Sequence, residues 1–388
     1  MRVLHVVEST TAGVGRHVYD LCAHMRRAGL DVAVACPRIR ERARHDIGFV
    51  DRLRAEGVTV VDVPMRYGLH PLADLRDCGR LVRLIRQERF DLVHAHSSKA
   101  GLLARLAVGL SREPSSVYTP NAFAFLGAEN GFRRWLYRSV EQWLGRSMTD
   151  MLICVSRSEM ALAGRWAIAP SEQMVTIENA IDPTHYAPIC SLAEAKSALG
   201  LDPDRLVVGY VGRLVVQKGI EYLLQAARQV LASNENVLFV LVGEGDLERS
   251  ARRTVESLGI EGQVLLPGYR TDIPQVLAAL DVFVLPSLYE GMPYTLMEAM
   301  ASGRAVVATD VVGNRDLVRH GETGMLVPAR NARALAGTTL GLLSAADERE
   351  RLGKAAFAAA RRRATPDQMA QQVVDLYAGI LERKRAKR

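Results

Sequence analysis

This chain of 388 residues lacks the features that mark several classes of protein. Its five cysteines are odd in number and form no close pair, which argues against a structural zinc site and favours a reducing compartment. No stretch approaches the roughly 18 apolar residues that a membrane-spanning helix needs. The N-terminus begins directly with an apolar strand, residues 3–7, in place of a secretory signal. We therefore expect a cytoplasmic protein.

The charge balance is mildly basic and does not indicate nucleic acid binding. Fifty Lys and Arg stand against 43 Asp and Glu, a net charge of +7, and the basic residues do not form an arm with interleaved aromatics. The densest basic cluster has helical spacing and consists of Arg133, Arg134, Trp135 and Arg138, with Trp143 and Arg146 beyond. This cluster suits the headgroup layer of an anionic membrane, and it suits a solvated helix with core aromatics equally well.

What the chain does contain is a regular alternation of apolar strands and helices. Hydrophobic residues make up 48% and charged residues 24%, as in a soluble globular protein, and the length suits two domains. The expected strands are residues 3–7, 31–35, 58–61, 92–95, 116–119 and 151–155, then 207–211, 237–242, 264–266, 282–285, 305–308 and 325–327. The rhythm predicts an α/β protein with two doubly wound parallel sheets, each covered on both faces. Residues 179–199 are the expected linker.

The most informative segment runs from residue 286 to residue 310. An expected buried strand ends at Pro286, and a helix over residues 295–300 follows a loop that carries Glu290. Glu298 then lies about one turn inside that helix. Ligands of open α/β sheets bind at such a strand end and helix start, where two carboxylates could each hold a diol beside amides that face a phosphate. An acidic first turn stabilised by the helix dipole is the alternative.

A second segment with the same placement follows the expected strand 207–211. It runs from Gly212 to Gly219 and carries Arg213 and Lys218 at the start of a helix. Two cations and a set of backbone N–H groups can converge there on one diphosphate. Two surface cations near an ordinary turn are the alternative.

Taken together, these motifs resemble a known family. Glu290, seven residues, then Glu298-Ala-Met-Ala-Ser-Gly looks like the paired-glutamate signature of GT-B glycosyltransferases, closest to the retaining family 4. Val312-Gly313-Asn314 followed by Gly321-x-x-Gly324 strengthens the resemblance. It implies two Rossmann-like domains that face a cleft: residues 1–186 for the acceptor and residues 187–365 for the nucleotide sugar. Residues 366–388 would form a helix that packs back on the first domain.

The resemblance also assigns roles. Arg213 and Lys218 would neutralise the leaving diphosphate in place of a metal ion, so we expect neither metal nor cofactor. Glu290 would hold the transferred sugar and Glu298 the ribose 2′- and 3′-hydroxyls. The remaining donor contacts implied by matching motifs are Gly13, Gly15, Gly212, Glu244, Arg270, Gly291, Met292, Thr295 and Leu296.

In the first half, a glycine segment and a histidine pair are candidates. Thr11 to Gly15 fails as a dinucleotide fingerprint, because Val18 stands where a third glycine or alanine is wanted, and fits a flexible loop over the diphosphate better. His94 and His96 end an expected strand, from which they could point into the cleft, and His96 is a candidate acceptor or sugar contact. A zinc pair lacks a third ligand in sequence reach.

One departure from the family pattern concerns the acceptor side. Asn121-Ala122 stands where many relatives carry histidine and glycine, and Asn179-Ala180 where they carry Asn-Gly. Asparagine can hydrogen-bond a sugar hydroxyl but cannot act as a general base. An inverting displacement would want that base and a retaining front-side reaction would not, so Asn121 fits the retaining mechanism.

We therefore expect a retaining, metal-independent glycosyltransferase that moves a sugar from a UDP- or GDP-sugar to a glycan or lipid-linked acceptor in cell-surface polysaccharide synthesis. It would work in the cytoplasm, at the inner face of the membrane. Two alternatives remain, a nucleotide-sugar 2-epimerase of the same fold and a non-catalytic nucleotide-sugar-binding protein. Release of nucleotide from a panel of donors, against formation of an epimer, separates the three.

Overall fold

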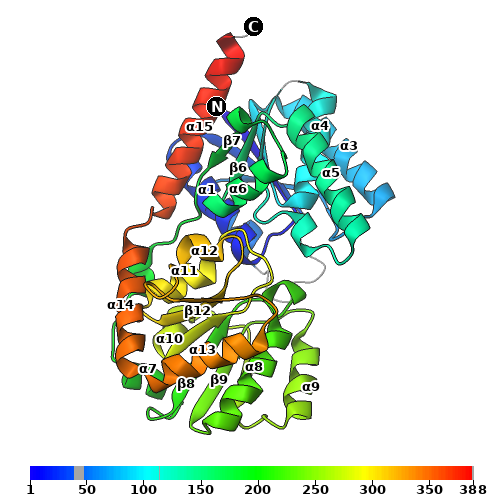
Figure 1. The fold of residues 1–388 in the computed structure, drawn as a ribbon. Helices are drawn as coiled ribbons and strands as arrows, with labels where there is room; N and C mark the ends of the chain where they lie inside the picture. The colour runs from blue at the N-terminus through cyan, green and yellow to red at the C-terminus, as the bar shows by residue number, and fades with distance from the viewer. Residues whose placement is uncertain (39–47, 113, 387–388) are drawn as a thin grey trace. The chain divides into compact units, whose positions relative to one another are not determined.

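The computed structural model describes residues 1–38, 48–112 and 114–386, and the chain divides into two compact units. Unit 1 comprises Met1–Asn179 and Pro366–Arg388, and unit 2 comprises Ala180–Thr365. Every strand pairing within both sheets is parallel. In each unit helices lie on both faces of the sheet (Figure 1), so the expected α/β class with two doubly wound parallel sheets is confirmed.

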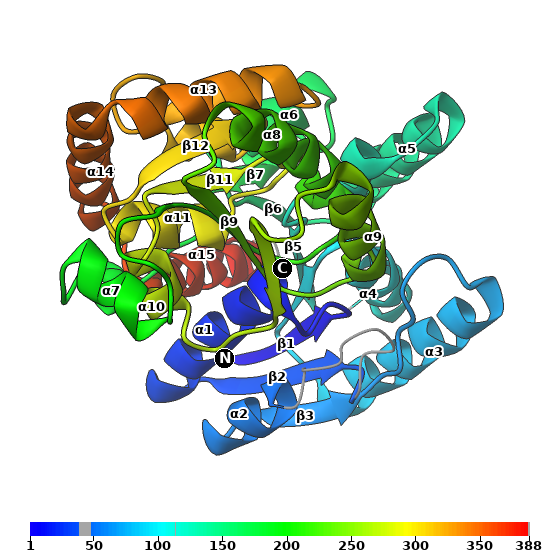
Figure 2. The ribbon, with the colours of Figure 1, turned by 90° about the horizontal axis from the view of Figure 1, so that it is seen from below.

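Unit 1 is built on a seven-stranded sheet in the order β3-β2-β1-β4-β5-β6-β7. Its elements are β1 (Arg2–Val7), α1 (Ala12–Arg27), β2 (Asp31–Cys36), α2 (Phe49–Ala55), β3 (Thr59–Asp62), α3 (Pro71–Glu88), β4 (Leu92–His96), α4 (Ser98–Ser111), β5 (Ser115–Thr119), η1 (Ala124–Gly127), α5 (Gly131–Ser147), β6 (Met151–Cys154), α6 (Arg157–Arg165), η2 (Ser171–Gln173), β7 (Met174–Thr176) and α15 (Pro366–Ala386). Helices α1 and α15 pack together on one face, and α3 and α4 cover the other (Figures 1 and 2).

Unit 2 is built on a six-stranded sheet in the order β10-β9-β8-β11-β12-β13. Its elements are η3 (Pro183–Tyr186), α7 (Leu192–Ala198), β8 (Leu206–Val211), η4 (Val216–Lys218), α8 (Ile220–Ser233), β9 (Val237–Val242), α9 (Glu248–Leu258), β10 (Val264–Gly268), α10 (Ile273–Ala278), β11 (Val282–Leu285), α11 (Tyr294–Ala301), β12 (Ala305–Thr309), α12 (Asn314–Leu317), β13 (Met325–Val327), α13 (Ala332–Ser344) and α14 (Ala346–Arg361). The central strands are wholly buried, which explains their unbroken apolar sequences.

The segment expected to be a linker is structured. Residues 179–199 contain η3 and α7, and α7 begins with a capping box in which Ser191 and Glu194 bond each other's backbone N–H groups. The boundary between the two units lies after Asn179, earlier in the chain than the boundary expected after residue 186. Two of the 23 residues expected in the last helix, 387 and 388, lie outside the described residues.

Candidate functional site

The order of strands in unit 2 reverses between β8 and β11, which lie side by side in the sheet. The helices that follow these two strands therefore cover opposite faces of the sheet, while the loops that leave the carboxyl ends of the strands meet at the switch point. In open α/β sheets ligands bind at this switch point. The loop after β8 carries Arg213 and Lys218, and the loop after β11 carries Glu290.

An ion pair joins these two loops. Lys218 Nζ lies 2.6 Å from Glu290 Oε1, and the Ser287 hydroxyl donates to the same oxygen at 2.6 Å. The Lys218 side chain is 12% exposed and that of Glu290 is 6% exposed. The structure thus brings together two residues 72 positions apart that the sequence analysis assigned to one site. A cation held this way can exchange its carboxylate partner for a phosphate.

Glycine is required where the two loops approach. Gly219 has φ +64°, and a Cβ there would lie 2.2 Å from the carbonyl oxygen of Pro286. Backbone hydrogen bonding continues the contact, because the Leu288 N–H donates to the carbonyl oxygen of Gln217 at 2.8 Å. A larger residue at position 219 would separate the loops, so this glycine sets the distance between Lys218 and Glu290.

The start of α11 lies at the same strand end. Gly291, Met292 and Leu296 are buried there, and the first amides of the helix have no partner within it. The side-chain oxygen of Thr295 is buried without a hydrogen-bond partner among the described residues. Buried polar atoms are normally satisfied, so an orphaned hydroxyl at the start of a helix indicates a place for an anionic or hydroxylated ligand.

Glu298 lies one turn further along α11 and is 6% exposed. The hydroxyl of Tyr186 donates to Glu298 Oε1 at 2.9 Å. Sequence analysis identified Glu298 but missed Tyr186, because the two are 112 positions apart and Tyr186 fell in the expected linker. No local spacing relates them.

Arg213 and Glu244 come from adjacent loops. The Leu214 N–H donates to the Glu244 carbonyl at 2.8 Å, and the Gly212 N–H donates to that of Val242 at 3.0 Å. The buried Tyr210 hydroxyl donates to the Arg213 carbonyl at 2.8 Å. Burial raises the pKa of Tyr210 well above its usual value, with Glu290 raising it further and Arg213 opposing. The charges of Glu290 and Arg213 therefore both act on the Tyr210 hydroxyl.

Arg270 is engaged within its own loop. Its guanidinium forms a two-pronged pair with Asp272, with 2.8 Å from Nε to Oδ1. This hydrogen bond lowers the pKa of Asp272 below its usual value. The pair fixes the loop after β10, so Arg270 would meet a ligand as one half of an ion pair, and Asp272 is a residue that the sequence analysis did not single out.

The glycine segment of unit 1 differs from the expected loop. Helix α1 starts at Ala12, so Gly13 and Gly15 belong to its first turn. A Cβ on Gly15 would lie 2.1 Å from the Thr10 carbonyl oxygen. The segment is helical because Gly15 lets the chain turn closely after β1. The expectation of a flexible loop from Thr11 to Gly15 was therefore wrong.

The histidine pair is part of a buried cluster rather than a free strand end. His94 and His96 lie on β4 beside His5 of β1, and His17 of α1 packs edge-on to His96. All four are at most 1% exposed. His5 Nδ1 and His96 Nε2 are 2.9 Å apart, and His94 bonds Tyr377 and Thr119 through its two ring nitrogens. Contrary to expectation, the pair lies in the core beneath α1 and α15.

A third histidine for a metal is therefore present, contrary to the expectation from sequence. One nitrogen each of His5, His94 and His96 lie within 4.8 Å of one another. However, both His94 nitrogens are hydrogen-bonded and His5 already bonds His96. His5 Nε2 and His96 Nδ1 have no hydrogen-bond partner among the described residues, but a metal held by all three rings would have to displace a bond of His94. The arrangement therefore fits a neutral cluster.

Asn121 and Ala122 both adopt positive φ, +52° and +87°. Asparagine tolerates this region, whereas alanine is strained there. The buried Glu159 carboxylate accepts from the Ala122 N–H at 2.9 Å and from the Val155 N–H at 2.8 Å, which holds the turn. The conformation that glycine would adopt is thus retained without glycine, and such strain concentrates at functional sites.

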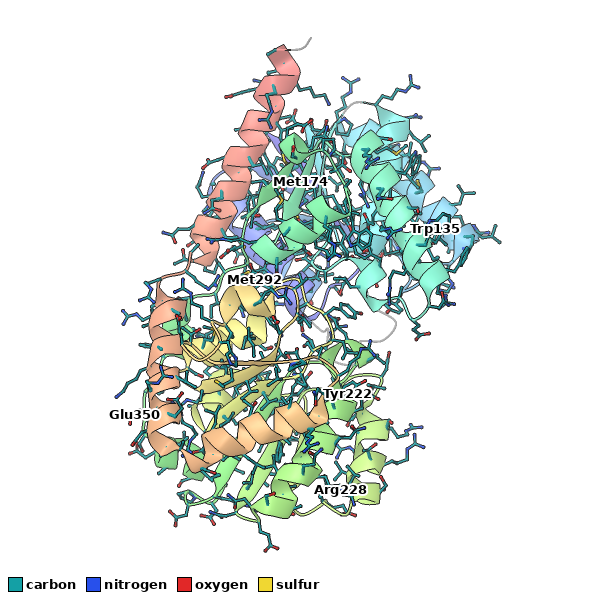
Figure 3. All side chains as sticks on the ribbon, in the orientation of Figure 1. Trp135, Met174, Tyr222, Arg228, Met292 and Glu350 are labelled. Carbon is teal, nitrogen blue, oxygen red and sulfur yellow. The ribbon has the colours of Figure 1, made fainter. Side chains whose placement is uncertain are left out.

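Helix α5 exposes aromatic as well as basic side chains. Phe132, Trp135 and Trp143 are 70%, 52% and 51% exposed, and Trp135 projects away from the helix (Figure 3). Of the predicted basic cluster, Arg138 stacks over the Trp166 ring at 4.3 Å and Arg146 donates to the Ala167 carbonyl. The alternative of a solvated helix with its aromatic residues in the core is therefore wrong for Trp135 and Trp143, which are exposed. Within the described residues, no helix is long and apolar enough to cross a membrane.

Comparisons with known proteins agree with this geometry. The family model described as "Glycosyl transferases group 1" matches residues 193–359, and that described as "Glycosyl transferase 4-like domain" matches residues 12–180. The chain is 32% identical over 260 residues to UDP-Gal:alpha-D-GlcNAc-diphosphoundecaprenol alpha-1,3-galactosyltransferase of Escherichia coli, covering 66% of this chain and 67% of that protein.

Solved structures show the same architecture. Anabaena Alr3699/HepE in complex with UDP and glucose has a TM-score of 0.82 at 22% identity, over 98% of this chain and 100% of that one. WaaG, a glycosyltransferase involved in lipopolysaccharide biosynthesis, has a TM-score of 0.78 at 17% identity, over 97% and 100%. At these identities the likeness speaks for the fold, and it confirms the expected GT-B fold.

Proposed function

This chain belongs to the group 1 glycosyltransferases, and on that premise we propose the reaction it catalyses. It moves a sugar from a UDP- or GDP-sugar to a glycan or lipid-linked acceptor, with retention of the anomeric configuration and without a metal ion. Unit 2 binds the donor and unit 1 the acceptor. The reaction serves cell-surface polysaccharide synthesis, in the cytoplasm at the inner face of the membrane.

The observation that carries this proposal is the Lys218–Glu290 pair at the switch point of unit 2, 2.6 Å between Nζ and Oε1. When a donor diphosphate enters, Lys218 turns to the phosphate and Glu290 is released to accept a hydroxyl of the sugar. Arg213 and the open amides of α11 add to the positive potential. Charge that grows on the leaving diphosphate is then stabilised by groups already in place, which is the most effective form of electrostatic catalysis.

Retention follows from what the acceptor side offers. A retaining front-side reaction lets the leaving phosphate take the acceptor proton, and the amide of Asn121 can orient a hydroxyl without removing its proton. The hydrogen bond from the Ala122 N–H to Glu159 orders the backbone of the turn that carries Asn121. The name of the Escherichia coli relative gives UDP-Gal as donor and a diphosphoundecaprenol-linked sugar as acceptor, which supports a UDP-sugar and a lipid-linked acceptor here.

Membrane contact through α5 is part of the proposal. Its exposed Phe132 and Trp135 would enter the interfacial layer while Arg133 and Arg134 meet anionic headgroups. Arg138, by contrast, is already stacked on Trp166 and would contribute less. A lipid-linked acceptor would then be presented at the surface where the enzyme is held.

The full chain incubated with UDP- and GDP-sugars tests the function. We expect nucleotide release with one or a few donors, transfer to a lipid-linked sugar acceptor, and no loss of rate in excess EDTA. Proton NMR of the product should show the anomeric configuration of the donor. Formation of an epimer in place of transfer would establish the 2-epimerase, binding without turnover would establish the sensor, and inhibition by EDTA would refute metal independence.

A further inference from the structure

The contact between Tyr186 and Glu298 joins two segments of unit 2 that have no sequence relation. Tyr186 ends the short helix η3, and its hydroxyl donates to Glu298 Oε1 at 2.9 Å. Both residues are buried, at 7% and 6% exposure. A carboxylate that is buried to this extent needs a hydrogen-bond donor, because an ionised group loses its hydration there.

The segment that carries Tyr186 is braced locally. Asp182 accepts from both the N–H and the hydroxyl of Thr184, at 2.9 and 2.6 Å, and Pro183 begins the turn. The ring of His185 stands edge-on to that of Tyr186 at 5.0 Å. η3 in turn packs against α10 and α11. The Tyr186 hydroxyl is therefore held in place independently of any ligand.

The consequence for Glu298 is orientational. The last torsion of a glutamate side chain is broad, so a carboxylate without a partner samples many rotations. A carboxylate offers about four lone-pair sites on two oxygens, and the phenol takes one site on Oε1. With Oε1 tied to Tyr186, the remaining sites keep a fixed direction. Tyr186 also leaves the charge of Glu298 in place, which a lysine or arginine partner would neutralise.

We propose that Tyr186 is a positioning residue for nucleotide recognition: it fixes the Glu298 carboxylate so that both ribose hydroxyls can be accepted together. This rests on the proposed function, in which Glu298 binds the ribose. Tyr186 itself does not touch the nucleotide in this account. If it served only to fill the core, its hydroxyl would have no influence on which nucleotide binds.

The test compares Tyr186→Phe with wild type by calorimetry, using UDP and 2′-deoxy-UDP, or the guanine pair if the donor panel selects GDP. We expect Tyr186→Phe to bind UDP about 10-fold more weakly, since the freed Glu298 carboxylate must then be ordered on binding, and 2′-deoxy-UDP nearly as well as wild type does. KM for the donor should rise while kcat stays close to wild type, because the ribose contact is equal in ground and transition states.

The control is Tyr19→Phe. It removes a hydrogen bond of the same kind, from Tyr19 to Glu56 Oε1 at 3.0 Å, within unit 1. This variant should leave both nucleotide affinities unchanged. The melting temperature of Tyr19→Phe also shows how much stability is lost when one such bond is removed. The melting temperature of Tyr186→Phe is compared with this value.

A double variant separates the inference from its premise. If Tyr186 acts through Glu298, adding Tyr186→Phe to Glu298→Gln should weaken UDP binding no further. Two results for Tyr186→Phe overturn the inference: an unchanged UDP affinity, or an equal loss of affinity for UDP and 2′-deoxy-UDP. The ribose assignment survives either result, provided that Glu298→Gln still loses the preference for UDP. If wild type shows no preference for UDP, or Glu298→Gln keeps it, the ribose assignment itself fails and the inference with it.

Discussion

Two buried lysine–carboxylate pairs lie at opposite ends of strand β11, and they differ in how completely they are bonded. Before the strand, Lys196 Nζ lies 2.8 Å from Asp281 Oδ2 and also donates to the carbonyls of Pro203 and Arg205. After the strand, the one partner of Lys218 Nζ among the described residues is Glu290. The first pair is also the more buried, at 3% and 4% exposure against 12% and 6%.

Burial alone does not distinguish a structural lysine from one that can bind a ligand, whereas the number of its hydrogen bonds does. A lysine whose three donors all meet protein acceptors is part of the scaffold, whereas one with donors to spare at the carboxyl end of a parallel strand is available to a ligand. The histidines of unit 1 follow the same rule. His94 and His96 lie on strand β4 itself, beneath helices, and form core although their sequence suggested a site.

Breaking each pair is the strongest test of this comparison. Lys218→Met should lower kcat about 100-fold, since a contact to charge that develops on the leaving group is lost. Lys196→Met should instead destabilise unit 2 by about 3–5 kcal/mol, because Asp281 is left buried and unpaired, with near-normal turnover below the melting transition. Steady-state kinetics and thermal unfolding by circular dichroism read the two effects. Equal loss of turnover in both variants would remove the distinction.

The histidine cluster extends the comparison to neutral groups. Burial lowers the pKa of His5 from 6.5 to about 3 and that of His17 to about 4. The unfolded chain therefore binds more protons below pH 6.5, so stability is lost as pH falls from about 6.5 towards those values, by up to about 1.4 kcal/mol per pH unit for each histidine.

All three tryptophans lie in unit 1, so denaturant unfolding followed by tryptophan fluorescence at pH 7.5 and 5.5 reports this loss. His5→Leu should flatten the pH dependence by the share of one histidine. A pH dependence that His5→Leu leaves intact would mean that His5 is not neutral in the folded state.

The surface of α5 provides a smaller effect. Arg133→Glu/Arg134→Glu should abolish sedimentation with vesicles of anionic lipid at low salt, since each basic residue near such a surface contributes about 1 kcal/mol. Arg249→Glu/Arg253→Glu on α9 makes the same charge change on exposed residues of unit 2 and should still sediment. If wild type ignores anionic vesicles at low salt, the aromatic residues of α5 have another role and a soluble acceptor becomes the better proposal.

The smallest expected effect concerns the strained turn of unit 1. Ala122→Gly should stabilise unit 1 by about 1 kcal/mol, because glycine adopts φ +87° without strain. Ala161→Gly, at an exposed position inside α6, should destabilise by about the same amount. Tryptophan fluorescence again provides the measurement, and destabilisation by Ala122→Gly would show that the backbone there is unstrained.

Sequence was sufficient for every described strand except β7 and for residues whose role depends on position along the chain. Glu290, Glu298 and Lys218 could be found because each lies a fixed distance from a strand end. Partners that are distant in sequence could not, since Tyr186 bonds Glu298 of the site across 112 residues and His5 bonds His96 of the core across 91. β7 was not predicted because its three residues are too few to show a periodicity. α7, in contrast, had a readable signal in Ser191 and Glu194, the ends of a capping box.

The central claim is that the carboxyl end of β11 binds a sugar nucleotide through two glutamates with separate partners. UDP affinity, measured by calorimetry for Glu298→Gln and Glu290→Gln, tests it most directly. Glu298→Gln should weaken UDP binding about 10-fold, because the ribose is present in donor and product alike. Glu290→Gln should not weaken it while turnover falls, because its partner is the transferred sugar and Lys218 is freed for the phosphates. Equal losses of UDP affinity in both variants would contradict the account.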